Sequence, residues 1–135
     1  MRPKLQLARA LTQEDPARAE SLLLEARRLY PRAPEVFTQM GTLMLDSGNP
    51  SRALPEFDQA LRLEPHSPDA HSNRGTALYL LGRLDEAEAE FLRGLELNRC
   101  HPNARHNLAV LYGNRGDQAR QRAVEMLPSE CRPAP

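Results

Sequence analysis

Apolar residues recur at helical spacing in the first part of the chain. Between residues 16 and 29 they follow the i, i+3, i+4, i+7 order of an amphipathic helix: Ala19, Leu22, Leu23, Ala26 and Leu29. Glu14-Asp15-Pro16 separates this helix from a shorter stripe made of Leu5, Ala8 and Leu11. Asp15 can cap the longer helix through its carboxylate, and Pro16 suits the first helical position, where its missing N–H costs nothing. Pro31 ends the helix.

The chain then repeats with a period of 34 residues. Residues 34–63, PEVFTQMGTLMLDSGNPSRALPEFDQALRL, carry Gly41, Gly48, Ala53, Phe57 and Leu63. The corresponding places in residues 68–97, PDAHSNRGTALYLLGRLDEAEAEFLRGLEL, are taken by Gly75, Gly82, Ala87, Phe91 and Leu97. A fixed period of this size indicates a repeat array, in which each helix pair buries its apolar face against its neighbours.

Proline and glycine mark the ends of the expected helices. The first helix of three successive units starts at a proline: Pro34, Pro68 and Pro102. It ends at a glycine that can take the left-handed conformation without a Cβ penalty, so that the chain reverses within a few residues: Gly48, Gly82 and Gly116. We therefore expect short turns between the two helices of each pair.

Two further glycines, Gly41 and Gly75, fall in the middle of first helices. Glycine there costs about 0.5–1 kcal/mol relative to alanine, so another contact must offset it. Close approach of the partner helix is the simplest reason, and the small residues expected to face these glycines are Ala53 and Ala87. The space between one helix pair and the next would then be filled by Phe57 and Phe91.

Two features depart from the repeat. Pro55 lies inside the helix that Asn49-Pro50 opens, where it removes a backbone hydrogen bond, so we expect a kink or a displaced helix start. The last helix, DQARQRAVEML, lacks the phenylalanine on which another repeat would pack, and its polar side suits the end of an array. Its apolar stripe is expected to consist of Ala119, Ala123, Met126 and Leu127. Residues 128–135, PSECRPAP, are expected to form a disordered tail.

The second unit resembles the tetratricopeptide repeat, whose pattern is W-x2-L-G-x2-Y, then A-x3-F, then P. Phe37-x2-Met40-Gly41-x2-Met44, Ala53-x3-Phe57 and Pro65 follow that pattern in order. The third unit resembles it through Gly75, Leu78, Ala87 and Phe91. The first and fourth units match at fewer places, so the resemblance covers residues 1 to about 127.

This resemblance implies an all-α fold: a right-handed α-solenoid of about four helix-turn-helix units with a C-terminal capping helix. The units would span about residues 1–33, 34–67, 68–101 and 102–127 of one domain. It also implies a protein-binding scaffold, because the family consists of such scaffolds in many unrelated proteins.

Composition excludes several classes of partner. The 18 basic and 18 acidic side chains cancel, so nothing indicates nucleic acid, whose binders cluster positive charge. No apolar run approaches the length of about 20 residues that crosses a bilayer, and the start is too weakly apolar for a signal peptide, so we expect no membrane insertion. Cys100 and Cys131 are too few for a disulfide framework and fit a reducing, cytoplasmic compartment.

The resemblance also implies where a partner binds, because the first helix of each stacked pair lines the concave side. The residues expected to form this peptide-binding groove are Gln39, Thr42, Asn73, Thr76, Tyr79, His106, Asn107 and Val110. Three of them lie 34 residues apart: Gln39, Asn73 and Asn107. Carboxamides donate and accept hydrogen bonds at once, so such a ladder can pair with the backbone of an extended peptide. The alternative is that these amides bond locally or to water, and that Tyr79 packs rather than stacks on a ligand.

Other kinds of site fit poorly. A specialised form of the fold clamps the acidic tail of chaperones with basic and amide groups; Lys4 would match, but Asp69 places a carboxylate where a cation is needed. His66 with His71, and His101 with His106, are five residues apart instead of the four that put two metal ligands on one helix face, and surface turns explain them. Neither Gly-Lys-Ser nor GxGxxG occurs, so no phosphate loop is indicated. We expect no metal and no cofactor.

The sequence therefore predicts a non-catalytic scaffold that binds a peptide or protein segment in a pre-formed groove. Two alternatives stay open. The chain could be the substrate-recruiting or regulatory segment of a larger enzyme, such as a glycosyltransferase, or a self-associating structural module that forms a homo-oligomer.

Overall fold

The computed structural model describes residues 15–128 as helices joined by short turns, with no strand among them. The chain divides into two compact units, Met1–Pro65 and His66–Pro135. The first contains α2 (Pro16–Leu29), α3 (Pro34–Asp46) and α4 (Pro50–Leu63). The second contains α5 (Pro68–Leu80), α6 (Leu84–Leu97), α7 (Pro102–Asn114) and α8 (Gln118–Glu125). The helix expected around Leu5 and residues 129–135 of the expected tail lie outside the described residues.

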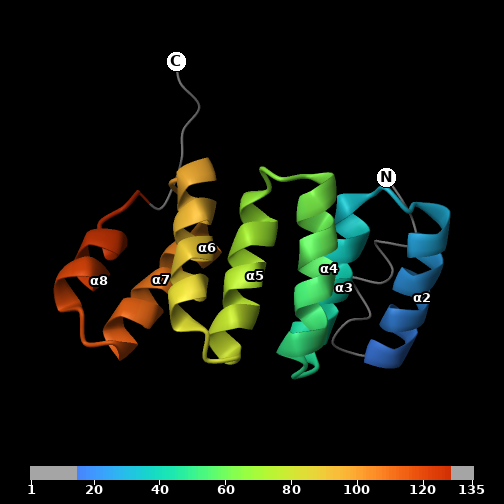
Figure 1. Cartoon of the computed structure of the whole chain (residues 1–135), viewed down its shortest axis with the longest axis horizontal. Coiled ribbons are helices and arrows are strands. Elements are labelled where there is room, and N and C mark those ends of the chain that lie inside the picture. The colour runs from blue at the N-terminus through green and yellow to red at the C-terminus, as the bar shows by residue number, and fades with distance from the viewer. Residues whose placement is uncertain (1–14, 129–135) are drawn as a thin grey trace, which may run out of the picture. The chain divides into compact units, whose positions relative to one another are not determined.

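Within each unit, helices that are consecutive in the chain pack against one another (Figure 1). In the first unit α3 contacts both α2 and α4, and in the second α6 contacts both α5 and α7, while α8 packs on α7. The core consists of small and aliphatic side chains around two fully buried rings, Phe57 and Phe91. This arrangement matches the predicted helix pairs.

Side chains of the preceding residue cap the starts of α2, α5 and α8. The carboxylates of Asp15 and Asp117 accept the backbone N–H of the residue three places on, at 3.1 Å in both cases. The hydroxyl of Ser67 does the same for α5 at 3.2 Å. These bonds satisfy N–H groups that have no partner inside the helix, and the predicted cap at Asp15 is one of them.

The three turns predicted from glycine share one geometry. Gly48, Gly82 and Gly116 have φ values of 78°, 77° and 76°, in the left-handed region. In each turn the next residue donates its N–H back over the glycine, with N···O distances of 2.8 to 2.9 Å: Asn49 to Met44, Arg83 to Leu78 and Asp117 to Tyr112. This is the Schellman motif, which closes a helix by bonding its last carbonyl groups. The predicted left-handed glycine turns are confirmed.

The mid-helix glycines are explained by aromatic rings. A Cβ atom on Gly41 would lie 2.5 Å from Cε1 of Phe57, and one on Gly75 would lie 2.7 Å from Cε1 of Phe91. The nearest side chain to each glycine is therefore the ring of its own helix pair, and the prediction that Ala53 and Ala87 face these glycines stays a prediction. Glycine is needed there since any side chain would occupy the position of the ring.

Pro55 does not displace the start of its helix. The helix α4 begins at Pro50 and runs to Leu63 without interruption, with Pro55 inside it. Both Pro55 and Ser51, whose carbonyl loses its usual donor, are at least partly accessible to solvent. Water can bond a carbonyl on the solvent side of a helix, which explains how the helix continues through the proline.

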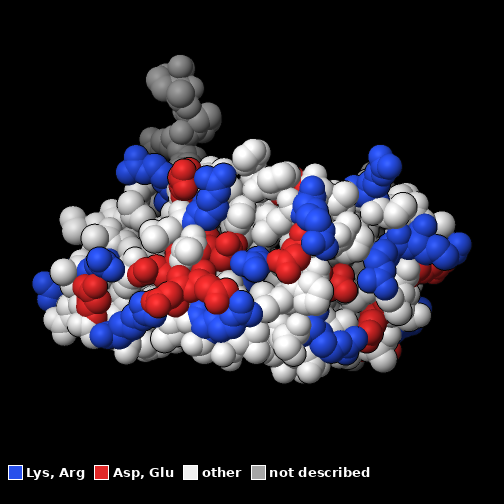
Figure 2. Space-filling view, in the orientation of Figure 1, with Lys and Arg blue, Asp and Glu red and all other residues white. Residues whose placement is uncertain are grey.

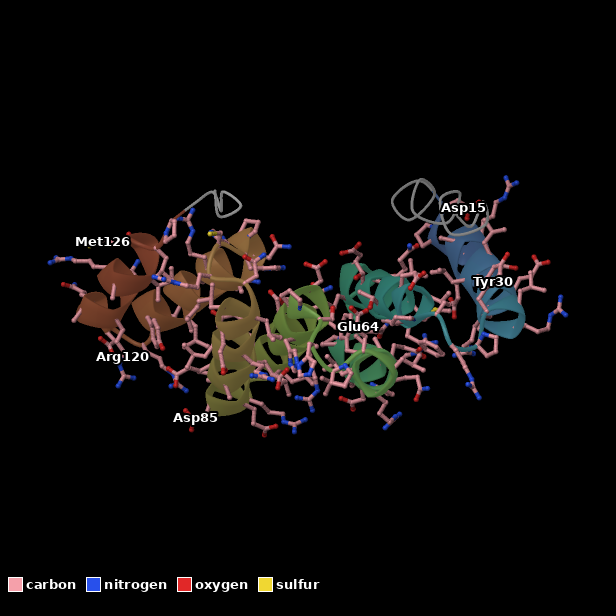
Figure 3. The ribbon with its side chains drawn as sticks, turned by 90° about the horizontal axis from the view of Figure 1, so that it is seen from above. Asp15, Tyr30, Glu64, Asp85, Arg120 and Met126 are labelled. Carbon is pink, nitrogen blue, oxygen red and sulfur yellow. The ribbon has the colours of Figure 1, made fainter. Side chains whose placement is uncertain are left out.

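The apolar stripe expected for the last helix is wrong. Ala119, Ala123 and Met126 are exposed, and Met126 has 84% of its surface accessible. Figure 3 shows Met126 and Arg120 on opposite sides of α8. The side of α8 that faces α7 instead carries buried Val124 and half-buried Gln121. Contact with α7 buries this side of α8, although it carries fewer apolar residues than the exposed side.

We predict that Gly75→Ala destabilises the second unit although alanine favours helix. The substitution should gain about 1 kcal/mol of helix propensity, but forcing the ring of Phe91 to move should cost about 1–3 kcal/mol more than that gain. Urea unfolding measures the change in the free energy of unfolding. In a Phe91→Ala background, itself destabilised by about 3–5 kcal/mol, the same substitution should become stabilising.

Gly113→Ala is the matched control, because Gly113 is also helical but a Cβ there would meet only the flexible Gln121 amide, at 3.2 Å. It should leave stability unchanged or raise it by up to about 1 kcal/mol. Equal effects of Gly75→Ala and Gly113→Ala would contradict the role assigned to the ring.

Candidate functional site

Two of the predicted groove residues, Gln39 and Thr42, lie on α3 in the first unit. Both are half-buried. The Thr42 hydroxyl donates to the Thr38 carbonyl at 2.9 Å, so this side chain bonds within its own helix. The Gln39 Oε1 atom is buried and has no hydrogen-bond partner among the described residues. Of the two, only Gln39 keeps an unused polar atom.

The second unit brings four of the other predicted residues around one pocket. Thr76 and Tyr79 of α5 and Asn107 and Val110 of α7 line it together with the ring of Phe91 from α6. Its volume is about 50 Å³ and its walls are mainly apolar. We call this the Phe91 pocket. The pocket forms because the ring of Phe91, which packs on Gly75, also lies beside α7, the first helix of the next pair.

The polar side chains of the Phe91 pocket hold α7 on α5. The Asn107 Nδ2 atom donates to Thr76 Oγ1 at 3.0 Å, and Thr76 Oγ1 donates to the Ser72 carbonyl at 3.1 Å. Asn114 Nδ2 donates to the Tyr79 hydroxyl. Asn107 therefore bonds locally with one N–H, as the alternative interpretation of the amide ladder expected. Its Oδ1 atom keeps no partner within residues 15–128.

Asn73 and His106 are not part of this pocket. Asn73 is half-buried on α5 and lines neither of the two pockets described in this unit. His106 lies on α7 and lines a different pocket. The predicted ladder of Asn73 and Asn107 stays a prediction.

A larger pocket lies between α7 and α8, with a volume of about 330 Å³. Its lining consists of Arg105, His106, Ala109, Val110, Gln121 and Glu125. Among them only His106 and Val110 were predicted from the sequence. The 34-residue period was the available signal: Ala109 and Glu125 take the places of Gly75 and Phe91, so the ring that closes the other helix pairs is missing here. We call this the α7–α8 pocket.

His101 fixes the start of α7 against α5. Its Nδ1 atom accepts the Ala104 N–H at 3.1 Å, so its proton is on Nε2, which donates to Asp69 Oδ1 at 2.5 Å. Only 5% of His101 is exposed, so the expectation that surface turns account for the histidines is wrong for this one. Gly94 of α6 completes the junction, since a Cβ there would lie 3.4 Å from Ala104 Cβ and from the Pro68 carbonyl oxygen.

Two further bonds hold α7, one just after its end and one near its start. Arg115 after α7 pairs with Asp85 of α6 at 2.7 Å, and Arg105 Nη1 donates to the Leu127 carbonyl at 2.9 Å. Because both ends of α7 are held, the walls of the two pockets are formed before any ligand is present.

Tyr112 lies where α6, α7 and α8 meet. Burial, a hydrogen bond to Glu88 and the charge of Glu88 raise the pKa of its hydroxyl from 10.0 to about 12. The Arg120 guanidinium lies 5.9 Å from the centre of the Tyr112 ring and partly offsets that rise. The hydroxyl is thus a structural proton donor at neutral pH.

Cys100 is buried and disulfide-bonded. The only other cysteine of the sequence, Cys131, lies outside the described residues. The expected cytoplasmic compartment stays a prediction. Within residues 15–128 no helix is long and apolar enough to cross a bilayer, and no three His, Cys, Asp or Glu side chains are grouped to hold a metal.

Comparison with known proteins identifies the repeat. A family model described as tetratricopeptide repeat matches residues 38–105, half of the chain. The chain belongs to the tetratricopeptide repeat family. The predicted all-α fold of tetratricopeptide helix pairs is confirmed. No curated protein sequence matches the chain.

Solved structures share this tetratricopeptide fold. A MamA crystal structure is 20% identical with a TM-score of 0.74; the match covers 84% of this chain and 66% of that one. The first TPR of Spaghetti (RPAP3), bound to the HSP90 peptide SRMEEVD, is 20% identical with a TM-score of 0.77, covering 84% and 90%. A thermophilic TPR protein from Thermus thermophilus, TTC0263, is 24% identical with a TM-score of 0.80, covering 90% and 68%. At these identities the likeness concerns the fold.

We predict that the stability of this tetratricopeptide protein falls between about pH 10 and about pH 12 through Tyr112. The folded-state pKa is raised to about 12, so between the two values the unfolded chain releases a proton that the folded chain keeps. Below pH 10 the hydroxyl is neutral in both states and adds no pH dependence. Urea unfolding across this range, compared with Tyr112→Phe, isolates the effect. A parallel pH dependence in the two proteins would contradict the raised pKa.

Proposed function

We propose that this protein is a non-catalytic scaffold that binds a peptide or protein segment, and that in the second unit the segment lies on the face of α5 and α7 that carries the Phe91 pocket. The observation that carries the proposal is the pocket itself. It joins an apolar floor, the ring of Phe91, to polar atoms of Thr76, Tyr79 and Asn107. Such a combination of an apolar pocket and a few placed polar groups is typical of ligand sites.

The size of the pocket favours a small aliphatic side chain. A volume of about 50 Å³ exceeds the roughly 30 Å³ that a water molecule occupies in the liquid, but it is too small for an aromatic ring. Val110 at the rim is 39% exposed, so a ligand side chain that enters would cover apolar surface that water now contacts. The unused Oδ1 of Asn107 can accept a backbone N–H from the same segment.

The rigidity of the walls supports useful affinity. Because Asn107 is bonded to Thr76, and Asn114 to Tyr79, α5 and α7 keep their places and little of the protein must be ordered on binding. The ordering cost then falls mainly on the ligand. A micromolar affinity, about −8 kcal/mol, is expected for a segment of this kind.

The RPAP3 domain of the same fold is described as bound to the HSP90 peptide SRMEEVD. That likeness supports a peptide as ligand, but the residues here do not favour an acidic one. Asp69 has 75% of its side chain exposed and places a carboxylate at the start of α5. A neutral or basic segment is compatible with that charge. Within the described residues no observation favours an enzyme-recruiting segment or a self-associating module over peptide binding.

We predict that Val110→Asp weakens peptide binding at least tenfold. Display of random peptides on phage against the native chain should select segments with small aliphatic residues, and the affinity of a synthetic copy can be measured by fluorescence polarisation. The new carboxylate would be desolvated beside the ring of Phe91, which explains the loss.

Leu92→Asp is the matched control, because Leu92 lies on α6, is similarly exposed and lines neither pocket. It should leave the affinity unchanged. Selection of no peptide, or equal losses in the two variants, would rule out the Phe91 pocket as the site.

A further inference from the structure

Glu125 differs from every other carboxylate described in the second unit. Arginine ion pairs engage six of the others, Asp85, Glu86, Glu88, Glu90, Glu96 and Asp117, while Asp69 accepts a hydrogen bond from His101. Glu125 has no ion-pair partner within residues 66–128. It is exposed on α8 and lines the α7–α8 pocket. This is the place in the unit where a negative charge is available to a ligand.

The larger group of acidic side chains on the surface is already paired with basic side chains. Figure 2 shows acidic side chains grouped over α6 with basic ones around them. Asp85 pairs with Arg115 at 2.7 Å, and Glu90 is contacted by both His71 at 2.9 Å and Arg74 at 3.4 Å. These pairs neutralise the group from within the unit, so a basic ligand would have to displace them.

The α7–α8 pocket is not built to receive another repeat. The helix α7 docks on α5 and α6 through four contacts. They are Asp69 with His101, Asp85 with Arg115, Thr76 with Asn107, and Gly94 with Ala104. The residues 34 places later, which would have to receive a further first helix, are Asn103, Ala119, Val110 and Pro128. Asn103 can accept a hydrogen bond as Asp69 does, but Ala119 cannot form the ion pair, Val110 cannot form the side-chain hydrogen bond, and Pro128 replaces the glycine of the close backbone contact. The occupant of this pocket is therefore of another kind.

The chemistry of the pocket fits a long basic side chain. Its floor is Ala109 and Val110, which suit the aliphatic stem of lysine or arginine, while Glu125 and the Gln121 amide oxygen suit its charged head. The volume of about 330 Å³ admits such a side chain, which the Phe91 pocket cannot. Arg105 is in the lining but already donates to the Leu127 carbonyl at 2.9 Å, which holds its guanidinium at the end of α8.

We propose that the α7–α8 pocket binds an arginine or lysine side chain of the partner segment, with the cation paired to Glu125. Val110 lines both pockets, so one segment that crosses α7 reaches the two of them. In this respect the inference rests on the proposed function: the partner carries a basic residue close to a small aliphatic one.

Nuclear magnetic resonance of the ¹⁵N-labelled chain tests the pocket with a defined probe, the blocked tripeptide acetyl-Ala-Arg-Ala-amide. The expected result is saturable shifts of the amide signals of α7 and α8 at Ala109, Val110, Gln121 and Glu125. The same peptide with citrulline, which is nearly isosteric but uncharged, should bind at least tenfold more weakly. Glu125→Gln should reduce the affinity for the arginine peptide by the same factor.

Glu86→Gln is the matched control, because it removes one exposed carboxylate from the same unit outside the pocket. It should leave binding unchanged, and circular dichroism should show both variants folded. Equal binding of arginine and citrulline peptides, shifts confined to α6, or no effect of Glu125→Gln would overturn the inference. If displayed peptides still lose affinity with Val110→Asp while Glu125→Gln has no effect, the proposed function stands and this inference alone fails.

Discussion

The contact between a phenylalanine ring and a glycine is the interaction on which the α3–α4 and α5–α6 helix pairs depend. Phe57 covers Gly41 and Phe91 covers Gly75, and both rings are fully buried. The glycine lets the ring approach the backbone of the first helix, so the second helix packs closely over it. Glycine is needed in each turn for a different reason: its left-handed φ disfavours any residue with a side chain, even where space is open. Two glycines per pair thus serve two separate constraints.

The same aromatic position decides where ligands can be held. In the third repeat Phe91 is present, and its ring is the floor of a small apolar pocket. In the fourth repeat Glu125 takes that place, and a larger pocket with a free carboxylate opens between α7 and α8. One substitution in the repeat therefore changes the chemistry of the surface between its two helices. The residue at this one repeat position, Phe91 or Glu125, therefore affects both the packing of the helix pair and the proposed binding of a ligand.

Polar side chains that sequence patterns assign to a ligand can be used by the fold instead. Asn107 was expected in a ladder of amides, but it donates to Thr76 and helps to hold α7 on α5. His101 was expected in a surface turn, but it is buried with both ring nitrogens bonded. In both cases the partner lies about one repeat away in the chain, at a separation of 31 or 32 residues. A residue type and its spacing do not show whether such a partner is within reach.

The sequence by itself determined the helix pairs, their caps and their turns. Asp15, Ser67 and Gly82 act on residues a few places away in the chain, so each cap or turn can be recognised from the nearby sequence. The 34-residue period indicated the family. Only the tertiary structure decided which side of α8 is buried, which residue lies over Gly75, and which side chains meet around the two pockets. Those outcomes depend on the relative placement of whole helices, where a ring or an ion pair from another helix outweighs the local apolar pattern.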